Sequence, residues 1–250
     1  MRGILVGVSV RRPISAFFPC FNDAGTIASM VMEALVVLRE LASEYEVIVV
    51  ENGSTDYAWD VLDELERLYG EDGVDPRDRG RVRIIRFAEA LDYGGALRAG
   101  FAACKYDFIF YTDGDGQYDV RELRSLYAAL EAEEASGRRV DVVMGNKITR
   151  RDPAHRRFIS FAYHHLMRFV FRFDVPDVDC DFRLIKRHVF DRIVLTQNSG
   201  GSGTFFYAVA ALKTAGGYQG TNAVLLGDRI APQTSRIVDG LAMCHANQAS

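Results

Sequence analysis

The sequence predicts an α/β fold built on a single, mostly parallel twisted sheet flanked by helices. Short β-rich runs alternate with stretches of helical periodicity along the first half of the chain, which is typical of parallel β-α-β units. Several of these runs end in polar or acidic residues, as strands do where open α/β sheets bind ligands. The 250 residues are 48% hydrophobic and 26% charged, an ordinary composition for one large globular domain, alone or with an appendage.

The strand predictions rest on short apolar runs bounded by turn residues. In chain order they cover 14–19, 46–51, 82–87, 107–112 and 140–145. A further strand is predicted over 182–186. The order of strands and helices therefore favours one continuous sheet.

Helices are predicted between the strands, over 26–41, 57–69 and 120–134. The first has a single stripe of apolar residues at helical spacing: Ile27, Met30, Val31, Ala34, Leu35, Leu38 and Leu41. Side-chain oxygens at 54–56 and at Asp119 precede the other two and are expected to cap them. The segment 70–80 is expected to be a solvated loop. Later helices are predicted over 188–195 and 204–215.

Residues 150–173 mix arginine and histidine with closely spaced aromatic and aliphatic side chains, a pattern that predicts a basic amphipathic helix. One interpretation packs its apolar face on the sheet. The other lays it at a bilayer interface, where cations meet lipid phosphates and aromatic rings enter the acyl boundary. Elsewhere no apolar run approaches the roughly 20 residues that span a bilayer. The sequence thus predicts a protein that is soluble or sits at a membrane surface.

Charge and cysteine content disfavour several functions. The 34 acidic and 30 basic residues give a formal charge of −4, which is not the basic footprint of a nucleic-acid-binding protein. The four cysteines stand far apart: Cys20, Cys104, Cys180 and Cys244. Neither a zinc site nor a disulfide framework is therefore predicted, and a reducing cytoplasm is the expected compartment. Because Arg11-Arg12-Pro13 interrupts the apolar start, no signal peptide is predicted.

The most informative segment runs from Phe108 to Asp119. An apolar strand ends there in Asp113 and Asp115, at the edge where open α/β sheets place their ligands. Carboxylate oxygens suit Mg²⁺ or Mn²⁺, and such a cation is usually completed by substrate phosphates. The sequence therefore implies a ligand that carries a diphosphate.

Three other interpretations of these acids fit the sequence less well. An EF-hand loop starting at Asp113 would need Gly and Glu where the chain has Tyr118 and Arg124, so that interpretation fails. A phosphatase with an aspartate nucleophile is disfavoured by Gln117, which is not the hydroxyl-bearing or small residue expected there. A solvated acidic turn explains two carboxylates after so apolar a strand less well than a cation site does.

Two other strands end in a similar way. The second continues into Glu51-Asn52-Gly53-Ser54-Thr55-Asp56, a turn before a helix N-terminus, where anions are attracted. The first ends in Pro19-Cys20-Phe21-Asn22-Asp23. We expect the three strand ends to converge on one crevice.

At this point the sequence resembles the family 2 glycosyltransferases with the GT-A fold, specifically the polyprenyl- and dolichyl-phosphate sugar synthases. The resemblance covers residues 14 to 195 in consistent order. The matching stretches are Pro19–Asp23, Val50–Asp56, Tyr93–Gly100, Thr112–Gln117, Gly145–Asp152 and Asp177–Leu184.

The resemblance implies a role for particular residues. Asp113, Asp115 and Gln117 would hold Mg²⁺ or Mn²⁺ on the diphosphate of a nucleotide sugar. The implied donor-binding set is Pro19, Phe21, Asn22, Glu51, Asn52, Ser54, Asp113 and Gly114, with Glu51 at the nucleobase. Asp177, with Asp179 as an alternative base, would act near the acceptor. Lys147, Arg156 and Ser160 would meet an acceptor phosphate.

The chain also departs from the family pattern. Ala90-Leu91-Asp92 replaces the family's Asn-x-Gly, and Asp181 stands where a small residue is usual. No acidic residue occurs between Asp191 and Asp228, where relatives carry one. We therefore expect a GT-A domain over 1–220 and a divergent C-terminal tail over 221–250.

The expected function is an inverting, metal-dependent hexosyl transfer from a UDP- or GDP-sugar to a polyprenyl phosphate. The expected location is the cytoplasm, with a peripheral contact at the cytoplasmic face of the membrane. One alternative is the same donor chemistry with a soluble hydroxyl acceptor, such as a natural product or glycan. Another is a degenerate, non-catalytic homologue that binds nucleotide. A dehydrogenase is disfavoured because no Gly-x-Gly-x-x-Gly follows the first strand. The sequence indicates no particular sugar, base or oligomeric state.

Overall fold

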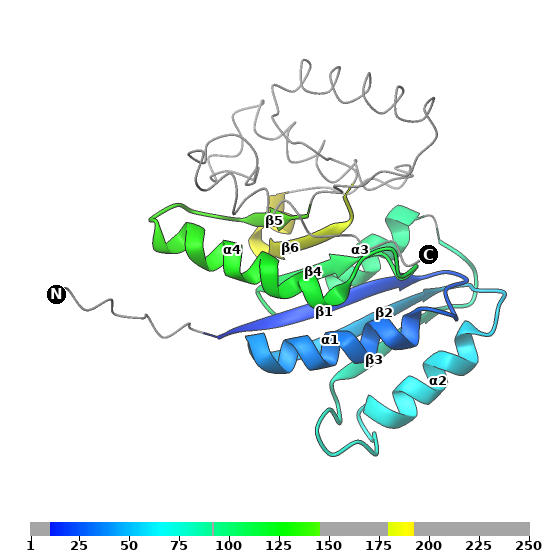
Figure 1. Ribbon diagram of the computed structural model, residues 1–250. Helices are drawn as coiled ribbons and strands as arrows, with labels where there is room; N and C mark the ends of the chain where they lie inside the picture. The colour runs from blue at the N-terminus through cyan, green and yellow to red at the C-terminus, as the bar shows by residue number, and fades with distance from the viewer. Residues whose placement is uncertain (1–10, 92, 146–179, 193–250) are drawn as a thin grey trace.

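The computed structural model describes residues 11–91, 93–145 and 180–192 of the chain. These residues form a six-stranded sheet with the strand order β3-β2-β1-β4-β6-β5 (Figure 1). The strands are β1 (Arg12–Cys20), β2 (Ala42–Asn52), β3 (Val82–Phe87), β4 (Phe108–Thr112), β5 (Val142–Met144) and β6 (Phe182–Lys186). The helices are α1 (Ile27–Leu41), α2 (Ala58–Tyr69), α3 (Tyr93–Ala103) and α4 (Leu123–Ala135), with short 3-10 helices at Val120–Glu122 and Arg187–Arg192.

Four strands, β3, β2, β1 and β4, pair in parallel, so their carboxyl ends lie at one edge of the sheet. The mostly parallel sheet predicted from the sequence is therefore confirmed. One strand departs from it, because β6 runs antiparallel between β4 and β5. Phe182, which begins β6, pairs with Thr112 at the end of β4, and the Gly145 N–H donates to the carbonyl of Phe182. The chain thus leaves β5 and enters β6 at the carboxyl end of β4.

Helices cover both faces of the sheet. Helices α1, α2 and α4 pack together over one face, and α3 packs on β1 and β2 from the other (Figure 1). Alternating residues of β1 point to the two faces of the sheet. Phe17 packs against Phe101 of α3, whereas Phe18 packs against Phe110 on the opposite face. The core is therefore continuous through the sheet.

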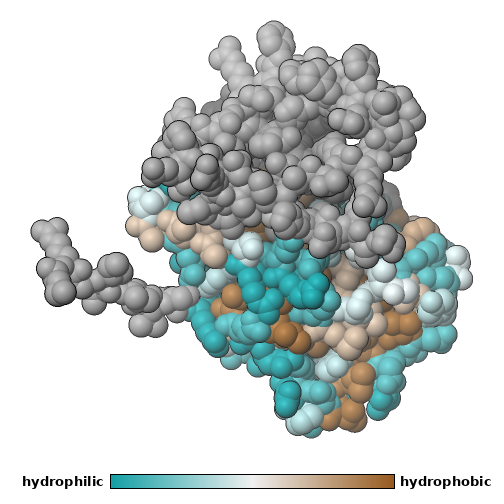
Figure 2. Space-filling model, viewed as in Figure 1, coloured by the Kyte–Doolittle hydropathy of each residue, from teal (hydrophilic) through white to brown (hydrophobic). Residues whose placement is uncertain are grey.

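The surface of this part of the protein is mixed in polarity. Figure 2 shows hydrophobic residues reaching the viewed face in separate patches between hydrophilic ones. Met32 and Val36, one turn apart on α1, are among the large apolar side chains that remain exposed. Among the described residues, no helix has the length and apolar character needed to span a bilayer.

Most predicted elements are confirmed, with small shifts at their ends. The strands over 82–87 and 182–186 match β3 and β6, whereas the predicted 140–145 strand shortens to β5. The predicted helix over 120–134 begins with one 3-10 turn, and the described start of the 188–195 helix is also 3-10. Helix α3 was not predicted. The segments 150–173 and 204–215 and the proposed domain boundary at residue 220 lie outside the described residues.

Candidate active site

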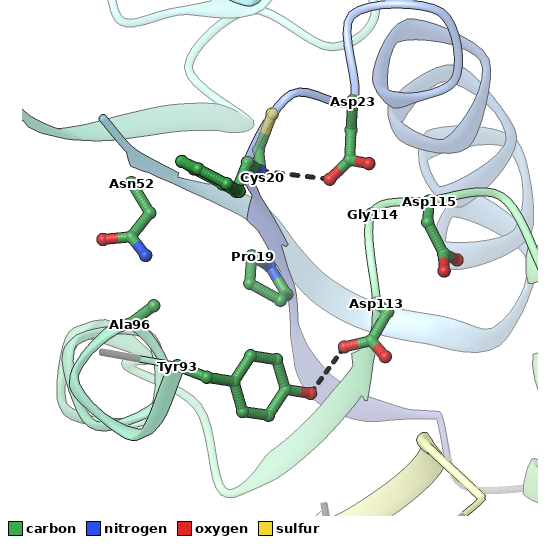
Figure 3. Close-up of a pocket in the computed structure, with 10 residues that line it drawn as sticks. Pro19, Cys20, Asp23, Asn52, Tyr93, Ala96, Asp113, Gly114 and Asp115 are labelled. Carbon is green, nitrogen blue, oxygen red and sulfur yellow. Dashed lines mark hydrogen bonds between the residues drawn. The ribbon is translucent and has the colours of Figure 1, made fainter. Parts of the chain in front are cut away.

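A pocket of about 220 Å³ lies at the carboxyl edge of the sheet, where β1, β2 and β4 end (Figure 3). The three strand ends that the sequence placed at one crevice are therefore brought together. The lining residues come from these strand ends and from the start of α3: Pro19, Cys20, Phe21, Asp23, Asn52, Tyr93, Ala96, Asp113, Gly114 and Asp115.

The pocket forms where β1 and β4 stop pairing. Their ladder ends at Phe17 and Tyr111, and Pro19, two residues later, has no amide hydrogen to continue it. Just beyond β4, the backbone of Gly114 lies against β1. A Cβ atom at Gly114 would stand 2.3 Å from the carbonyl oxygen of Pro19, so only glycine fits here without a shift of the backbone. The loop that carries the two aspartates is thus seated on the end of β1.

Asp113 and Asp115 project on either side of Gly114 (Figure 3). Asp113 is partly buried, and its Oδ1 accepts hydrogen bonds from the hydroxyls of Tyr93 at 2.7 Å and Tyr111 at 2.9 Å. Burial raises the pKa of Asp113; the two hydroxyls act against that shift, and the negative charge of Asp115 adds to it. The pair therefore concentrates negative charge at the pocket, as a cation site does.

Asp115 is exposed, and its Oδ1 accepts a 2.9 Å hydrogen bond from the main-chain N–H of Gln117. The side chain of Gln117 is itself exposed and is not among the described residues that line the pocket. The structure thus places the two predicted aspartates in the site and Gln117 beside it. The predicted metal contact of Gln117 stays a prediction.

Sequence reasoning gave no role to Asp23, which also lines the pocket. Burial raises the pKa of Asp23, a backbone hydrogen bond from Phe21 lowers it, and the charges of Asp115 and Asp113 raise it further. Its position directly after the polar end of the first strand was the signal that could have identified it. Next to it, burial and the charge of Asp23 raise the pKa of the Cys20 thiol to about 12, so Cys20 stays neutral.

Asn22 and Ser54, both predicted to bind the donor, join the loop after β1 to the loop after β2. The side-chain oxygen of Asn22 accepts from the N–H groups of Thr55 at 2.7 Å and Asp56 at 3.3 Å. In return, the N–H of Asn22 donates to Oγ of Ser54 at 3.0 Å. These side chains therefore shape the rim of the site by holding its loops together.

Glu51 and Asn52 also bind neighbouring backbone. Glu51 is fully buried, and its carboxylate accepts from the N–H groups of Gly53 and Ser54. Asn52 lines the pocket and exchanges two hydrogen bonds with the main chain of Leu91, at 2.8 and 3.1 Å. Phe21, in contrast, leaves half of its surface exposed beside the pocket.

The remaining predicted site residues lie outside the described part of the chain. They are Asp177, Asp179, Lys147, Arg156 and Ser160. Nearby, the N–H of Asp181 donates to the hydroxyl of Tyr118 at 3.1 Å, so the start of β6 is tied to the loop that follows the two aspartates.

The residues at the pocket fit a divalent cation that is shared with a ligand. No group of three His, Cys, Asp or Glu side chains within the described ranges is arranged to hold a metal alone. Asp113 and Asp115 offer hard oxygen ligands, and Mg²⁺ or Mn²⁺ is commonly bound by one or two carboxylates with phosphates and water. The arrangement therefore suits a cation that arrives with a diphosphate.

The comparisons with known proteins concern the family and the fold. The model of glycosyl transferase family 2 matches residues 15–194. The chain is 30% identical over 182 residues to the glycosyltransferase AglD of Haloferax volcanii, covering 72% of this chain and 27% of that protein. It is 26% identical over 193 residues to the dolichyl-phosphate beta-glucosyltransferase of Saccharomyces cerevisiae, covering 70% of this chain and 54% of that protein. The chain thus spans about a quarter to a half of the length of these relatives.

A similar solved structure is glucosyl-3-phosphoglycerate synthase from Mycobacterium tuberculosis in complex with Mn²⁺, uridine diphosphate and glucosyl-3-phosphoglycerate. Its TM-score is 0.55 at 17% sequence identity, and the match covers 82% of this chain and 67% of that one. The likeness concerns the fold. The sheet and its flanking helices are those of the GT-A fold predicted from the sequence.

Proposed function

The chain belongs to glycosyl transferase family 2, and from this membership we propose that it transfers a sugar from a UDP- or GDP-sugar to a polyprenyl phosphate, with inversion and with a divalent cation. The observation that carries the proposal is the pair Asp113 and Asp115 at the pocket where β1, β2 and β4 end. Open α/β sheets bind ligands at this edge. The acidic pair supplies the charge that a cation-bound diphosphate requires.

The donor half of the proposal follows from the charge distribution. Two carboxylates beside a pocket would repel a bare diphosphate, so Asp113 and Asp115 must hold Mg²⁺ or Mn²⁺ for the donor to bind. When bound, the cation stabilises the negative charge that develops on the departing diphosphate. The half-exposed ring of Phe21 offers an apolar face beside the same pocket for the nucleoside.

The acceptor half rests on the relatives. Several of them carry a lipid phosphate in their names, among them the dolichyl-phosphate beta-glucosyltransferase of yeast and the dodecaprenyl-phosphate galacturonate synthase of Rhizobium johnstonii. A phosphate acceptor is already anionic and needs little deprotonation. We assign its phosphate to Lys147, Arg156 and Ser160, at the cytoplasmic face of a membrane. A hydroxyl acceptor would need a base, for which Asp177 and Asp179 are the candidates.

The donor half is tested by thermal unfolding with UDP, GDP, CDP or ADP, each with and without Mn²⁺. A ligand at 100 times its dissociation constant stabilises a protein by about 2.7 kcal/mol. We expect UDP or GDP to raise the melting temperature only with Mn²⁺, and Asp115→Asn to abolish the rise. The matched control is Asp72→Asn, because the Asp72 side chain is 98% exposed in the loop between α2 and β3. No nucleotide shift in the wild type would contradict the proposal.

The acceptor half is tested by incubating the protein with a nucleotide sugar and with liposomes that contain polyprenyl phosphate. The nucleotide sugar carries the preferred base and a radiolabelled sugar. We expect label in the lipid fraction and loss of that label in Arg156→Ala, with the nucleotide shift retained. Label transferred only to a soluble hydroxyl compound would contradict the lipid acceptor and support the hydroxyl acceptor instead. Equal loss of acceptor use and nucleotide binding in Arg156→Ala would contradict the role given to Arg156.

A further inference from the structure

We propose that Tyr93 and Tyr111 are positioning residues, which hold the carboxylate of Asp113 in the orientation that receives the divalent cation. The inference rests on the proposed function, because it assigns these tyrosines to the cation site of that reaction. Neither tyrosine was singled out from the sequence as a site residue, since aromatic side chains beside a strand are usually part of the core.

The proposal starts from the convergence of two hydroxyls on one oxygen. Tyr93 begins α3 and Tyr111 lies near the end of β4, yet both donate to Oδ1 of Asp113, at 2.7 and 2.9 Å. The two hydroxyl oxygens also lie in contact with each other. Figure 3 shows the Tyr93 hydroxyl meeting Asp113 along one side of the pocket, with the other oxygen of this carboxylate turned away from the tyrosine. One carboxylate oxygen of Asp113 is thus held by the two tyrosines, and the other oxygen points away from Tyr93.

The tyrosines are themselves held by packing. The fully buried ring of Tyr111 stacks on Phe17 of β1 at 5.0 Å and lies 5.7 Å from Phe101 of α3. Gly100 brings α3 close to the sheet, because a Cβ atom at this position would lie 2.4 Å from the Phe17 ring. The distance between α3 and β4 is therefore set by the core, and with it the distance between the two hydroxyls.

This arrangement has the properties of a support for a metal ligand. Carboxylates that bind metals are commonly oriented by outer hydrogen bonds, and removing such a partner typically weakens metal binding 10- to 100-fold. A purely structural role is a weaker explanation, because the hydrogen bonds converge on the very carboxylate that lines the pocket beside Asp115. Tyr93 itself lines the pocket, so this support for Asp113 lies at the site.

The test measures Mn²⁺ binding by the electron paramagnetic resonance signal of free Mn²⁺ during titration in the presence of saturating UDP or GDP, after subtraction of the same titration of the nucleotide without protein. We expect Tyr93→Phe and Tyr111→Phe each to raise the Mn²⁺ dissociation constant by about 10-fold or more. The matched control is Tyr45→Phe. Tyr45 is also a buried tyrosine that donates to an aspartate, Asp78, at 2.7 Å, but it lies near the start of β2, away from the pocket. We expect it to bind Mn²⁺ as the wild type does.

Melting temperatures without metal separate positioning from stability. We expect Tyr93→Phe to melt no lower than Tyr45→Phe, although of these two variants only Tyr93→Phe loses Mn²⁺ affinity. If Tyr111→Phe does not fold, Tyr93→Phe carries the test, because Tyr93 lies at the edge of the core. Wild-type Mn²⁺ affinity in Tyr93→Phe, with binding lost in Asp113→Asn, would overturn the positioning role and leave the proposed function intact. Absence of Mn²⁺ binding in the wild type would overturn both.

Discussion

The hydroxyl of Thr26 donates a 2.7 Å hydrogen bond to the main-chain carbonyl of Gly114, between the two aspartates of the pocket. Thr26 stands at the N-cap position of α1, yet its side chain makes no capping hydrogen bond to that helix. It connects α1 to the aspartate loop instead. The position of Asp113 and Asp115 therefore depends on a helix that lies far from them in the sequence.

Replacement of Thr26 by valine should loosen this loop. The change keeps the shape of the side chain and removes the hydroxyl that donates to the Gly114 carbonyl. The free energy of unfolding should fall by about 1 kcal/mol. We expect a lower melting temperature and a smaller Mn²⁺-dependent nucleotide shift in Thr26→Val. Thr26→Ser, which retains the hydroxyl, is the control; if it loses as much nucleotide binding as the valine variant, the hydrogen bond is not responsible.

Gly114→Ala should displace the aspartate loop from the end of β1. Its Cβ atom would meet the Pro19 carbonyl oxygen at 2.3 Å, and overpacking of this kind typically costs about 1–3 kcal/mol. We expect the Mn²⁺-dependent nucleotide shift to disappear. Gly25→Ala is the control, because a Cβ atom there has no neighbour within 4 Å among the described residues, and its stability should change by less than about 0.5 kcal/mol. A nucleotide shift of wild-type size in Gly114→Ala would contradict this reasoning.

Asn22 should matter for the rigidity of the rim. Its backbone has a φ angle of 61°, in the left-handed region, and its side-chain oxygen accepts from the loop after β2. Asn22→Gly removes the hydrogen bonds but suits the backbone, so we expect a loss of about 1–3 kcal/mol in unfolding free energy by urea denaturation. Asn22→Ala should lose about 1 kcal/mol more because of the left-handed backbone. Equal stability of the two variants would show that the backbone angle contributes nothing.

Asp23→Asn should stabilise the metal-free protein at neutral pH. Burial, together with the charges of Asp115, Asp113 and Asp56, outweighs the Phe21 hydrogen bond and raises the pKa of Asp23. A carboxyl whose pKa is raised by folding stabilises the protein below its unfolded pKa, and this stability is lost as pH rises through the folded value. Asparagine avoids that loss and can still accept from the Phe21 N–H.

Melting temperatures across the acidic range check the prediction for Asp23. The advantage of Asp23→Asn should be largest at neutral pH and vanish below the ordinary aspartate pKa of about 3.9. A difference that does not change with pH would assign the effect to packing instead of charge.

The strands were predictable because each apolar run gives way to polar residues where the strand ends. The predicted strands end at Pro19, Glu51 and Thr112, each within one residue of the observed end, and parallel pairing then brings the polar residues that follow to one edge. The direction of β6 was not predictable, because alternation of side chains is the same in parallel and antiparallel strands. Its place between β4 and β5 depends on long-range pairing.

Helix α3 was missed because Gly94, Gly95 and Gly100 give its segment a low helix propensity. Gly100 is needed there for its small size, since Phe17 fills the space beside it, and the sequence does not reveal that contact. The polar residues of the site raise a similar difficulty. Asn22 and Asp113 are both polar residues after a strand, but only the structure shows that one binds a neighbouring loop and the other lines the pocket.

The antiparallel pairing of β5 and β6 holds the two ends of the intervening stretch of chain close together. Gly145, which precedes residues 146–179, donates to the carbonyl of Phe182 where β5 pairs with β6, and Phe182 in turn pairs with Thr112 at the end of β4. A segment anchored at two adjacent points can change in length or sequence at little entropic cost to the sheet. Because the residues proposed to meet the acceptor fall in this segment, a change there would alter the proposed acceptor site and leave the pocket at the carboxyl edge of the sheet as it is.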